Sequence, residues 1–165
     1  MFTDLTIPAQ LPAYMGMLTN ILVAVHVVNS ALWVGAVFMG SVIDPPALKN
    51  SADGQPSFLV NFIVMQGARV FPWVYAAMSL IFLTGLSLTW LHPPQNTMEL
   101  SLVIAKFIAL GIMAGNTLYG TFVTWPKIQF ATPEEVFVLW RPYLIRAYVT
   151  LACGIAAFIM GVMLK

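Results

Sequence analysis

The stretch NILVAVHVVNSALWVG, Asn20 to Gly35, decides the fold because it is apolar enough to enter a lipid bilayer. It nevertheless contains three polar residues, His26, Asn29 and Ser30. A helix needs about 20 apolar residues to cross the hydrocarbon core, and this apolar run extends over about residues 18–43. Since the chain has only 2 histidines, the placement of one inside a membrane span needs an explanation.

The composition of the whole chain favours a membrane protein. Hydrophobic residues make up 60% of the 165 residues and charged residues only 8%, whereas a soluble domain has about 25% charged residues. Further apolar runs of span length occupy about residues 70–91, 100–123 and 144–164. Irregular backbone is not tolerated against lipid. We therefore expect an all-α antiparallel four-helix bundle, up-down-up-down, as a single transmembrane domain over residues 1–165.

Turn and capping signals separate these runs. Proline pairs at Pro45–Pro46 and Pro93–Pro94 end the first two spans, because proline cannot continue a helix. Thr132, followed three residues later by Glu135, predicts a helix start. We expect a short interfacial helix over about Pro133–Arg141 before the last span. A similar amphipathic segment, SFLVNFIVMQGA, leads into the second span.

The basic residues predict the orientation in the membrane. We define side A as the end with both termini and the loop around His92, and side B as the opposite end. Side A has only Lys165, whereas side B has the following basic residues: Lys49, Arg69, Lys127, Arg141 and Arg146. Lysine and arginine collect on the cytoplasmic side. We therefore expect both termini on the non-cytoplasmic side of an inner (cell) membrane. The first apolar run is longer than a signal-peptide core and follows no basic region, so we expect it to remain as a span.

Two ionisable residues inside the spans point to a functional site. His26 lies about eight residues into the first span and Lys106 about seven residues into the third, both counted from side A. At about 1.5 Å per residue, both lie roughly 10–12 Å below the same membrane edge. Such groups are costly inside a membrane and by default indicate a functional site.

The expected spacing of the helices suits a flat ligand between these two residues. In an up-down-up-down bundle the first and third spans are diagonal, and their axes are roughly 11–14 Å apart. A planar macrocycle fits this spacing, with His26 giving an imidazole to a haem iron and Lys106 a neutral amine. His92, at the side-A end of the second span, is the alternative second ligand. We therefore predict one haem b per chain and assign no catalytic residue.

Other polar residues follow these two along the same helix faces. Asn29 and Trp33 lie on the face of His26, and Asn116 lies on the face of Lys106. We predict that these residues contact the cofactor. The alternative is ordinary helix packing, in which His26 hydrogen-bonds across helices and Lys106 extends to the side-A interface.

A second polar cluster is expected near side B. It contains Arg69 and Arg146 together with Asp44 and Arg141. One interpretation is anchoring of the spans on the cytoplasmic side. The other is an anion site, for example for the propionates of a haem or porphyrin.

The motifs around these residues resemble a known superfamily. HVVNSALWVGAVF, with His26, Trp33 and Gly35, resembles the first helix of the superfamily that includes CopD-type copper-resistance membrane proteins and HemJ-type protoporphyrinogen oxidases. LVIAKFIALGIMAGN, with Lys106 near its start, resembles the third helix. FIVMQGARVFPWVYAAMSLIFLTGLSLTW is similar to the second helix at Met65, Arg69, Pro72 and Gly85. The resemblance covers about residues 20–124.

The resemblance implies a four-helix membrane protein that binds haem b, with His26 as ligand and Lys106 as its partner. For the HemJ branch it implies oxidation of protoporphyrinogen IX to protoporphyrin IX, with electrons passed to quinone or the respiratory chain. Gln66 stands where the resemblance expects a glutamate, and RPYLIRAYVTL replaces the HemJ-like ending. The resemblance therefore supports a haem-binding bundle more completely than it supports the HemJ reaction.

The expected function is a haem b-binding redox protein in the lipid bilayer, either an oxidoreductase or an electron-transfer subunit. Quinone or another redox protein is the expected partner, and the chain is expected as a homodimer or as part of a larger complex. CopD-like transport of copper or a small solute, or a structural accessory role, are the alternatives. The single cysteine, Cys153, excludes an intramolecular disulfide and cysteine-based metal sites. The net charge of +1 gives no indication of nucleic-acid binding.

Overall fold

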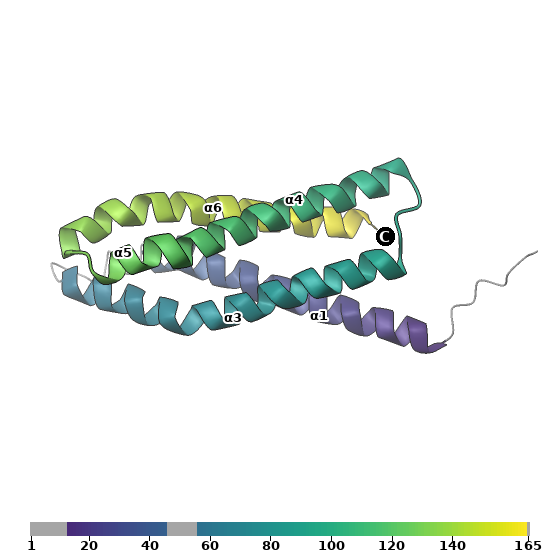
Figure 1. Ribbon diagram of the computed structural model, residues 1–165, viewed down its shortest axis with the longest axis horizontal. Helices are drawn as coiled ribbons and strands as arrows, with labels where there is room; N and C mark the ends of the chain where they lie inside the picture. The colour runs from purple at the N-terminus through teal and green to yellow at the C-terminus, as the bar shows by residue number, and fades with distance from the viewer. Residues whose placement is uncertain (1–12, 46–55, 165) are drawn as a thin grey trace, which may run out of the picture.

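Four long helices form an antiparallel bundle in the computed structural model, which describes residues 13–45 and 56–164 (Figure 1). The long helices are α1 (Ala13–Phe38), α3 (Pro56–Leu91), α4 (Thr97–Tyr119) and α6 (Pro133–Met163). Shorter elements lie toward side B: the π-helical segments η1 (Met39–Ile43) and η2 (Gly120–Thr124), and the helix α5 (Trp125–Gln129). The described residues contain no strand, so the predicted all-α bundle is confirmed.

Each of the four helical units is long and apolar enough to cross a membrane. The spans are Met15–Ile43, Val64–Leu91, Thr97–Gln129 and Val138–Met163. Large hydrophobic side chains remain exposed along all four spans. Lipid is the solvent that suits such surfaces, because it leaves the outward-facing apolar side chains in an apolar environment. The chain is therefore a multi-pass membrane protein.

The predicted helix starts and stops agree with the structure in two places. The helix α3 ends before Pro93–Pro94. Thr132 caps α6 by a complete capping box, in which its hydroxyl accepts from the Glu135 backbone and the Glu135 carboxylate accepts from the Thr132 backbone. At the other loop Asn96 caps α4 by accepting from the backbone N–H of Glu99 at 2.9 Å.

The helices continue through several positions where the sequence predicts a boundary. The expected interfacial helix over Pro133–Arg141 is the first part of α6, which includes Pro142 without a break. The amphipathic segment before the second span is likewise part of α3, which includes Pro72. Proline is tolerated in such spans because neighbouring helices and local adjustments satisfy the freed backbone groups. Pro45 is still helical, whereas Pro46 lies outside the described residues.

The helices are arranged as two pairs. α1 packs along α3 and α4 along α6, and the pairs meet mainly where α1 contacts α6. Figure 1 shows the α1/α3 pair below the α4/α6 pair. The first and third spans, α1 and α4, are therefore on a diagonal of the bundle, as predicted. The main core lies between the pairs and consists of Trp33, Val74, Ala77, Ile81 and Met113.

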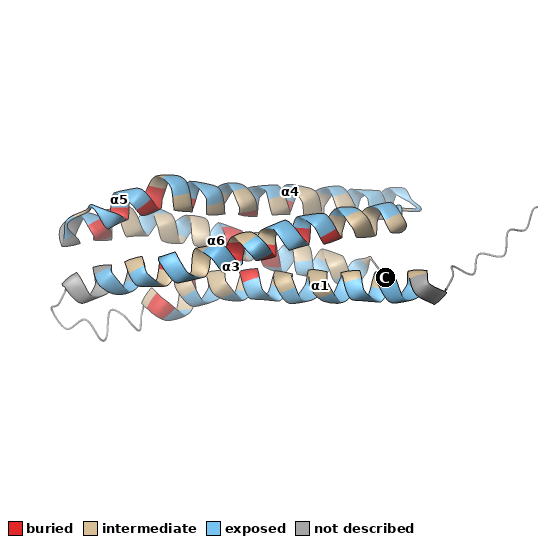
Figure 2. Cartoon of the chain, turned by 60° about the horizontal axis from the view of Figure 1, so that its bottom comes forward, coloured by how far each residue is buried: buried red, intermediate tan, exposed pale blue. Residues whose placement is uncertain are grey.

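Burial is confined to the middle of the bundle and its side-B half (Figure 2). None of the described residues in 15–32, 85–108 and 155–164 is buried. The closed core therefore ends at about the level of Thr84 and Ala109, and the described residues nearer to side A are half-buried or exposed.

Candidate functional site

His26 is held by a second helix in the side-A part of the bundle. Its ring is half-buried, and Nδ1 lies 2.8 Å from Oγ1 of Thr84 on α3. The Thr84 hydroxyl has one proton, which it donates to the carbonyl of Leu80 at 2.6 Å. With its proton in that bond, the hydroxyl oxygen is free to accept from Nδ1–H of His26. In this arrangement the neutral imidazole has its proton on Nδ1 and a lone pair on Nε2.

A glycine gives this imidazole its place beside α3. A Cβ atom on Gly85 would lie 3.4 Å from Cε1 of His26, so the ring lies directly against the α3 backbone. A histidine that binds a metal typically donates its other ring N–H to a fixed partner, which sets the tautomer and the ring orientation. His26 has this arrangement, with Thr84 as the partner.

Lys106 lies in the same part of the bundle interior. It is half-buried on α4, and its Nζ lies 3.5 Å from the position that a Cβ atom on Gly161 of α6 would occupy. Its ammonium group is close enough to His26 to interact with it electrostatically. The structure thus brings His26 and Lys106 together, as their equal depth predicts.

His92 lies at the membrane edge. Its side chain is exposed, and Nε2 lies 3.1 Å from Oγ1 of Thr19 on α1. Thr19 precedes His26 by seven residues, which corresponds to about 10 Å along a helix. The structure therefore places His92 at the rim of the side-A region, where it links α3 to α1.

The two polar residues that follow His26 on α1 are satisfied within that helix. The Asn29 side chain donates to the carbonyl of Val25 at 2.8 Å, and the Ser30 hydroxyl donates to the carbonyl of His26 at 2.8 Å. One N–H of the Asn29 amide is used by this bond, and no contact of the residue with another helix supports the predicted role at a cofactor.

Trp33 and Asn116 belong to a different region from His26 and Lys106. Trp33 is 1% exposed and lies in the closed core. Asn116 donates to Oγ1 of Thr150 on α6 at 3.2 Å. Both residues line a separate cavity toward side B. The structure does not bring them to the site of His26.

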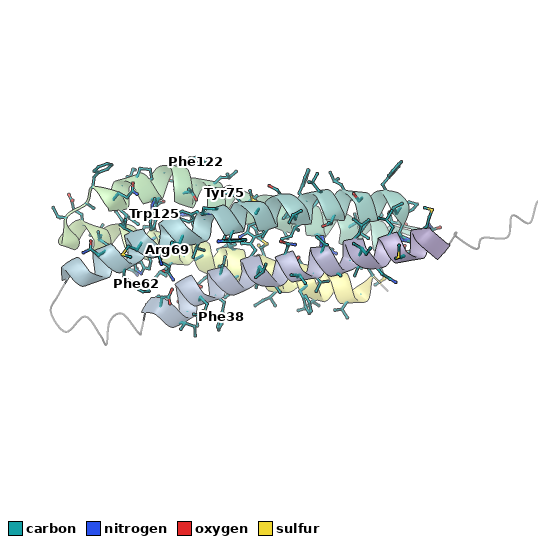
Figure 3. All side chains as sticks on the ribbon, turned by 90° about the horizontal axis from the view of Figure 1, so that it is seen from below. Phe38, Phe62, Arg69, Tyr75, Phe122 and Trp125 are labelled. Atoms are coloured by element: carbon teal, nitrogen blue, oxygen red, sulfur yellow. The ribbon has the colours of Figure 1, made fainter. Side chains whose placement is uncertain are left out.

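The predicted side-B cluster is divided in the structure. Arg69 is exposed near the side-B end of α3 (Figure 3), and Arg141 is also exposed. Asp44 is buried and accepts a hydrogen bond from Gln66. Arg146 lies inside the bundle, where Nη2 donates to the hydroxyl of Thr124 at 2.7 Å. These residues do not form ion pairs with one another.

Thr84 is a residue of this candidate site that the sequence analysis missed. A threonine in an apolar span attracts no attention, because its hydroxyl commonly bonds to its own helix. Its depth in the membrane could have indicated the contact. Thr84 lies about seven residues from the side-A end of its span, which is close to the depth of His26.

The side-A residues fit a haem by the chemistry of their donors. His26 offers an imidazole lone pair, Lys106 offers an amine, and the described residues nearer to side A than Thr84 are half-buried or exposed. A bare metal ion is less suitable there, because the described residues hold no group of three or more histidine, cysteine, aspartate or glutamate side chains.

No family model, curated protein or solved structure matches this chain.

Proposed function

We propose that this protein binds one haem b in the side-A part of the bundle and acts in electron transfer within the membrane. The observation that carries this proposal is the orientation of His26. Thr84 accepts a hydrogen bond from Nδ1–H and so leaves Nε2 with a lone pair, in a part of the bundle whose described residues are mostly half-buried or exposed.

His26 would bind the iron, and Lys106 would supply the second group. As a neutral amine Lys106 would be the other iron ligand, in keeping with the diagonal placement of α1 and α4. Thr84 would keep the imidazole in its binding tautomer. Bound haem supplies one-electron chemistry, which the protein tunes through the axial ligands and burial.

The closed core would separate the haem from side B. The apolar cluster around Trp33 and Met113 fills the bundle interior below the level of Thr84. Electrons would therefore be exchanged laterally or at side A, with quinone or another redox protein as partner. A second copy of the chain or a larger complex would complete the assembly.

The finer assignment is a HemJ-like oxidation of protoporphyrinogen IX, in which the porphyrinogen loses hydrogen to become protoporphyrin IX and quinone or the respiratory chain accepts the electrons. It is supported by the resemblance of the first three helices to that superfamily. The accompanying topology would have side B on the cytoplasmic side of an inner membrane, and the exposed Arg69, Lys127 and Arg141 toward that end support it.

An absorption spectrum of the detergent-purified protein tests the proposal. The protein is expressed with ample haem and measured both oxidised and reduced with dithionite. We expect a Soret band and sharp reduced α-bands in the wild type. The bands should be lost in His26→Ala and shifted in Lys106→Ala. His92→Ala is the matched control and should keep the wild-type spectrum.

Chemical rescue separates ligation from a structural role of His26. Imidazole added to His26→Gly should restore the Soret band, because it replaces the missing ligand without repairing any helix contact. A colourless wild-type protein, or haem retained in full by folded His26→Ala, would overturn the proposal. Copper in the purified colourless protein would then favour transport, and its absence a structural accessory role.

A further inference from the structure

A small cavity with a mixed apolar and polar lining lies in the core between the side-A region and side B. Its volume is about 80 Å³. All four long helices contribute to its wall, and both π-helical segments contribute a glycine, Gly40 and Gly120. Its polar lining residues are Trp33, Asn116, Thr117, Tyr143, Arg146 and Thr150. No aspartate or glutamate is among the described residues that line it.

Two buried N–H groups of this lining have no partner among the described residues. They are Nε1 of Trp33 and Nε of Arg146. The Trp33 side chain is 1% exposed, so lipid and bulk water do not reach it. A buried donor left unpaired costs about 1–3 kcal/mol, and more in a charged group. Two such donors at one cavity indicate that it holds an acceptor.

The cavity also carries an uncompensated positive charge. Arg146 lies about eight residues into its span, about 12 Å from the side-B edge. Its guanidinium contacts the hydroxyl of Thr124 and lies 4.6 Å from the centre of the Tyr119 ring. The buried carboxylate of Asp44 is bonded to Gln66 and forms no ion pair with Arg146. An arginine inside a membrane is costly unless it is paired.

The neighbouring polar groups bond to one another. The Asn116 amide donates to Thr150 at 3.2 Å and reaches the carbonyl of Arg146 at 3.5 Å. The Thr150 hydroxyl donates to that same carbonyl at 3.0 Å. The unmet groups at the cavity are therefore donors, which an anion satisfies without needing a proton of its own.

We propose that this cavity binds one small monovalent inorganic anion, such as chloride, through Nε–H of Arg146 and Nε1–H of Trp33. The volume is sufficient for this class of ligand, because about 10–15 Å³ of such volume already holds one water molecule. The site is independent of haem, since no residue of the His26 region lines it.

Thermal unfolding in matched salts tests the proposal on the whole detergent-purified protein. The midpoint temperature of unfolding is measured in a series of buffers in which sodium chloride replaces sodium gluconate at constant ionic strength. A ligand that binds only the folded state raises the midpoint with its concentration. We expect a saturable rise with chloride and bromide. Trp33→Phe should need about tenfold more chloride for half of the effect, the equivalent of one lost hydrogen bond of about 1.4 kcal/mol.

Arg146→Gln should abolish the chloride effect, and Arg69→Gln, which removes an exposed arginine at the same end, should leave it unchanged. Line broadening of chloride-35 in NMR gives a second measurement on the wild type alone and does not require a variant to fold. Equal midpoints in chloride and gluconate without broadening would show that the cavity holds water. An equal chloride effect in all folded variants would place binding elsewhere. Either result would overturn the proposal.

Discussion

Replacing Thr84 with valine removes the partner of His26 while keeping the shape of the side chain. The change eliminates the 2.8 Å bond between α1 and α3 and leaves Nδ1–H of His26 without an acceptor. Hydrogen bonds between membrane helices are worth about 0.6 kcal/mol on average and up to about 1.7. Because a half-buried donor is left unpaired, we expect a loss near the upper end, about 1–2 kcal/mol.

The free energy of unfolding is measured by titrating SDS into detergent micelles and following tryptophan fluorescence. Thr89→Val is the matched control, because the Thr89 hydroxyl donates to the carbonyl of Gly85 on its own helix at 2.8 Å and bonds to no other helix. Both variants lose a bond within α3, so the difference between them reports the contact with His26. We expect Thr84→Val to lose at least about 0.6 kcal/mol more than Thr89→Val.

A double-mutant cycle with His26→Leu completes the test. If the two side chains interact as the geometry indicates, Thr84→Val should cost no more than Thr89→Val once His26 is absent. Haem affinity, where haem is bound, should fall about 10–100-fold in Thr84→Val, as it does when the partner of a ligating histidine is removed. Equal losses in the two threonine variants and no coupling in the cycle would refute the contact between Thr84 and His26, whether or not the protein binds haem.

Two further predictions concern the stability of the bundle. Gly154→Ala should lower the free energy of unfolding in the SDS titration by about 1–3 kcal/mol, because its Cβ would lie 2.7 Å from Cγ2 of Val34. Gly115→Ala, whose Cβ would meet nothing within 4 Å, should cost nothing, and Val34→Ala should rescue the first variant; a failure of that rescue would disprove the contact. Thr132→Ala should cost about 1 kcal/mol in the same titration by removing the capping box, and an unchanged value would show that the cap contributes no stability.

The four spans could be predicted because lipid imposes one requirement on every residue of a span, which hydropathy measures directly. Their boundaries were harder to predict. Pro142 removes one backbone donor, and whether the helix continues past it depends on neighbours that the local sequence does not specify. The third unit likewise continues past its predicted end near residue 123, through the helix α5 (Trp125–Gln129), although this helix contains Pro126.

The candidate site was predicted in part because depth can be counted along a helix. His26 and Lys106 lie at similar depth on diagonal helices, and the structure brings them to one region. Trp33 shares the helix face of His26, but it lies seven residues further on, about 10 Å deeper. The spacing of residues on one helix face shows in which direction around the helix axis a side chain points. It does not show how far along the axis the side chain lies from the site. This difference explains why Trp33 and Asn116 line the separate cavity and do not contact the site of His26.

The closed core makes the two proposed sites independent. Ile81 and Met113 belong to the closed core and do not line the cavity, and sites more than about 7–10 Å apart without shared partners usually contribute additively. His26→Ala should therefore remove haem and leave the chloride dependence of the midpoint unchanged. Arg146→Gln should do the reverse. If Arg146→Gln also lost haem, the structural effect of the substitution would have to pass through the core residues to the His26 site, since no side chain is shared by both sites.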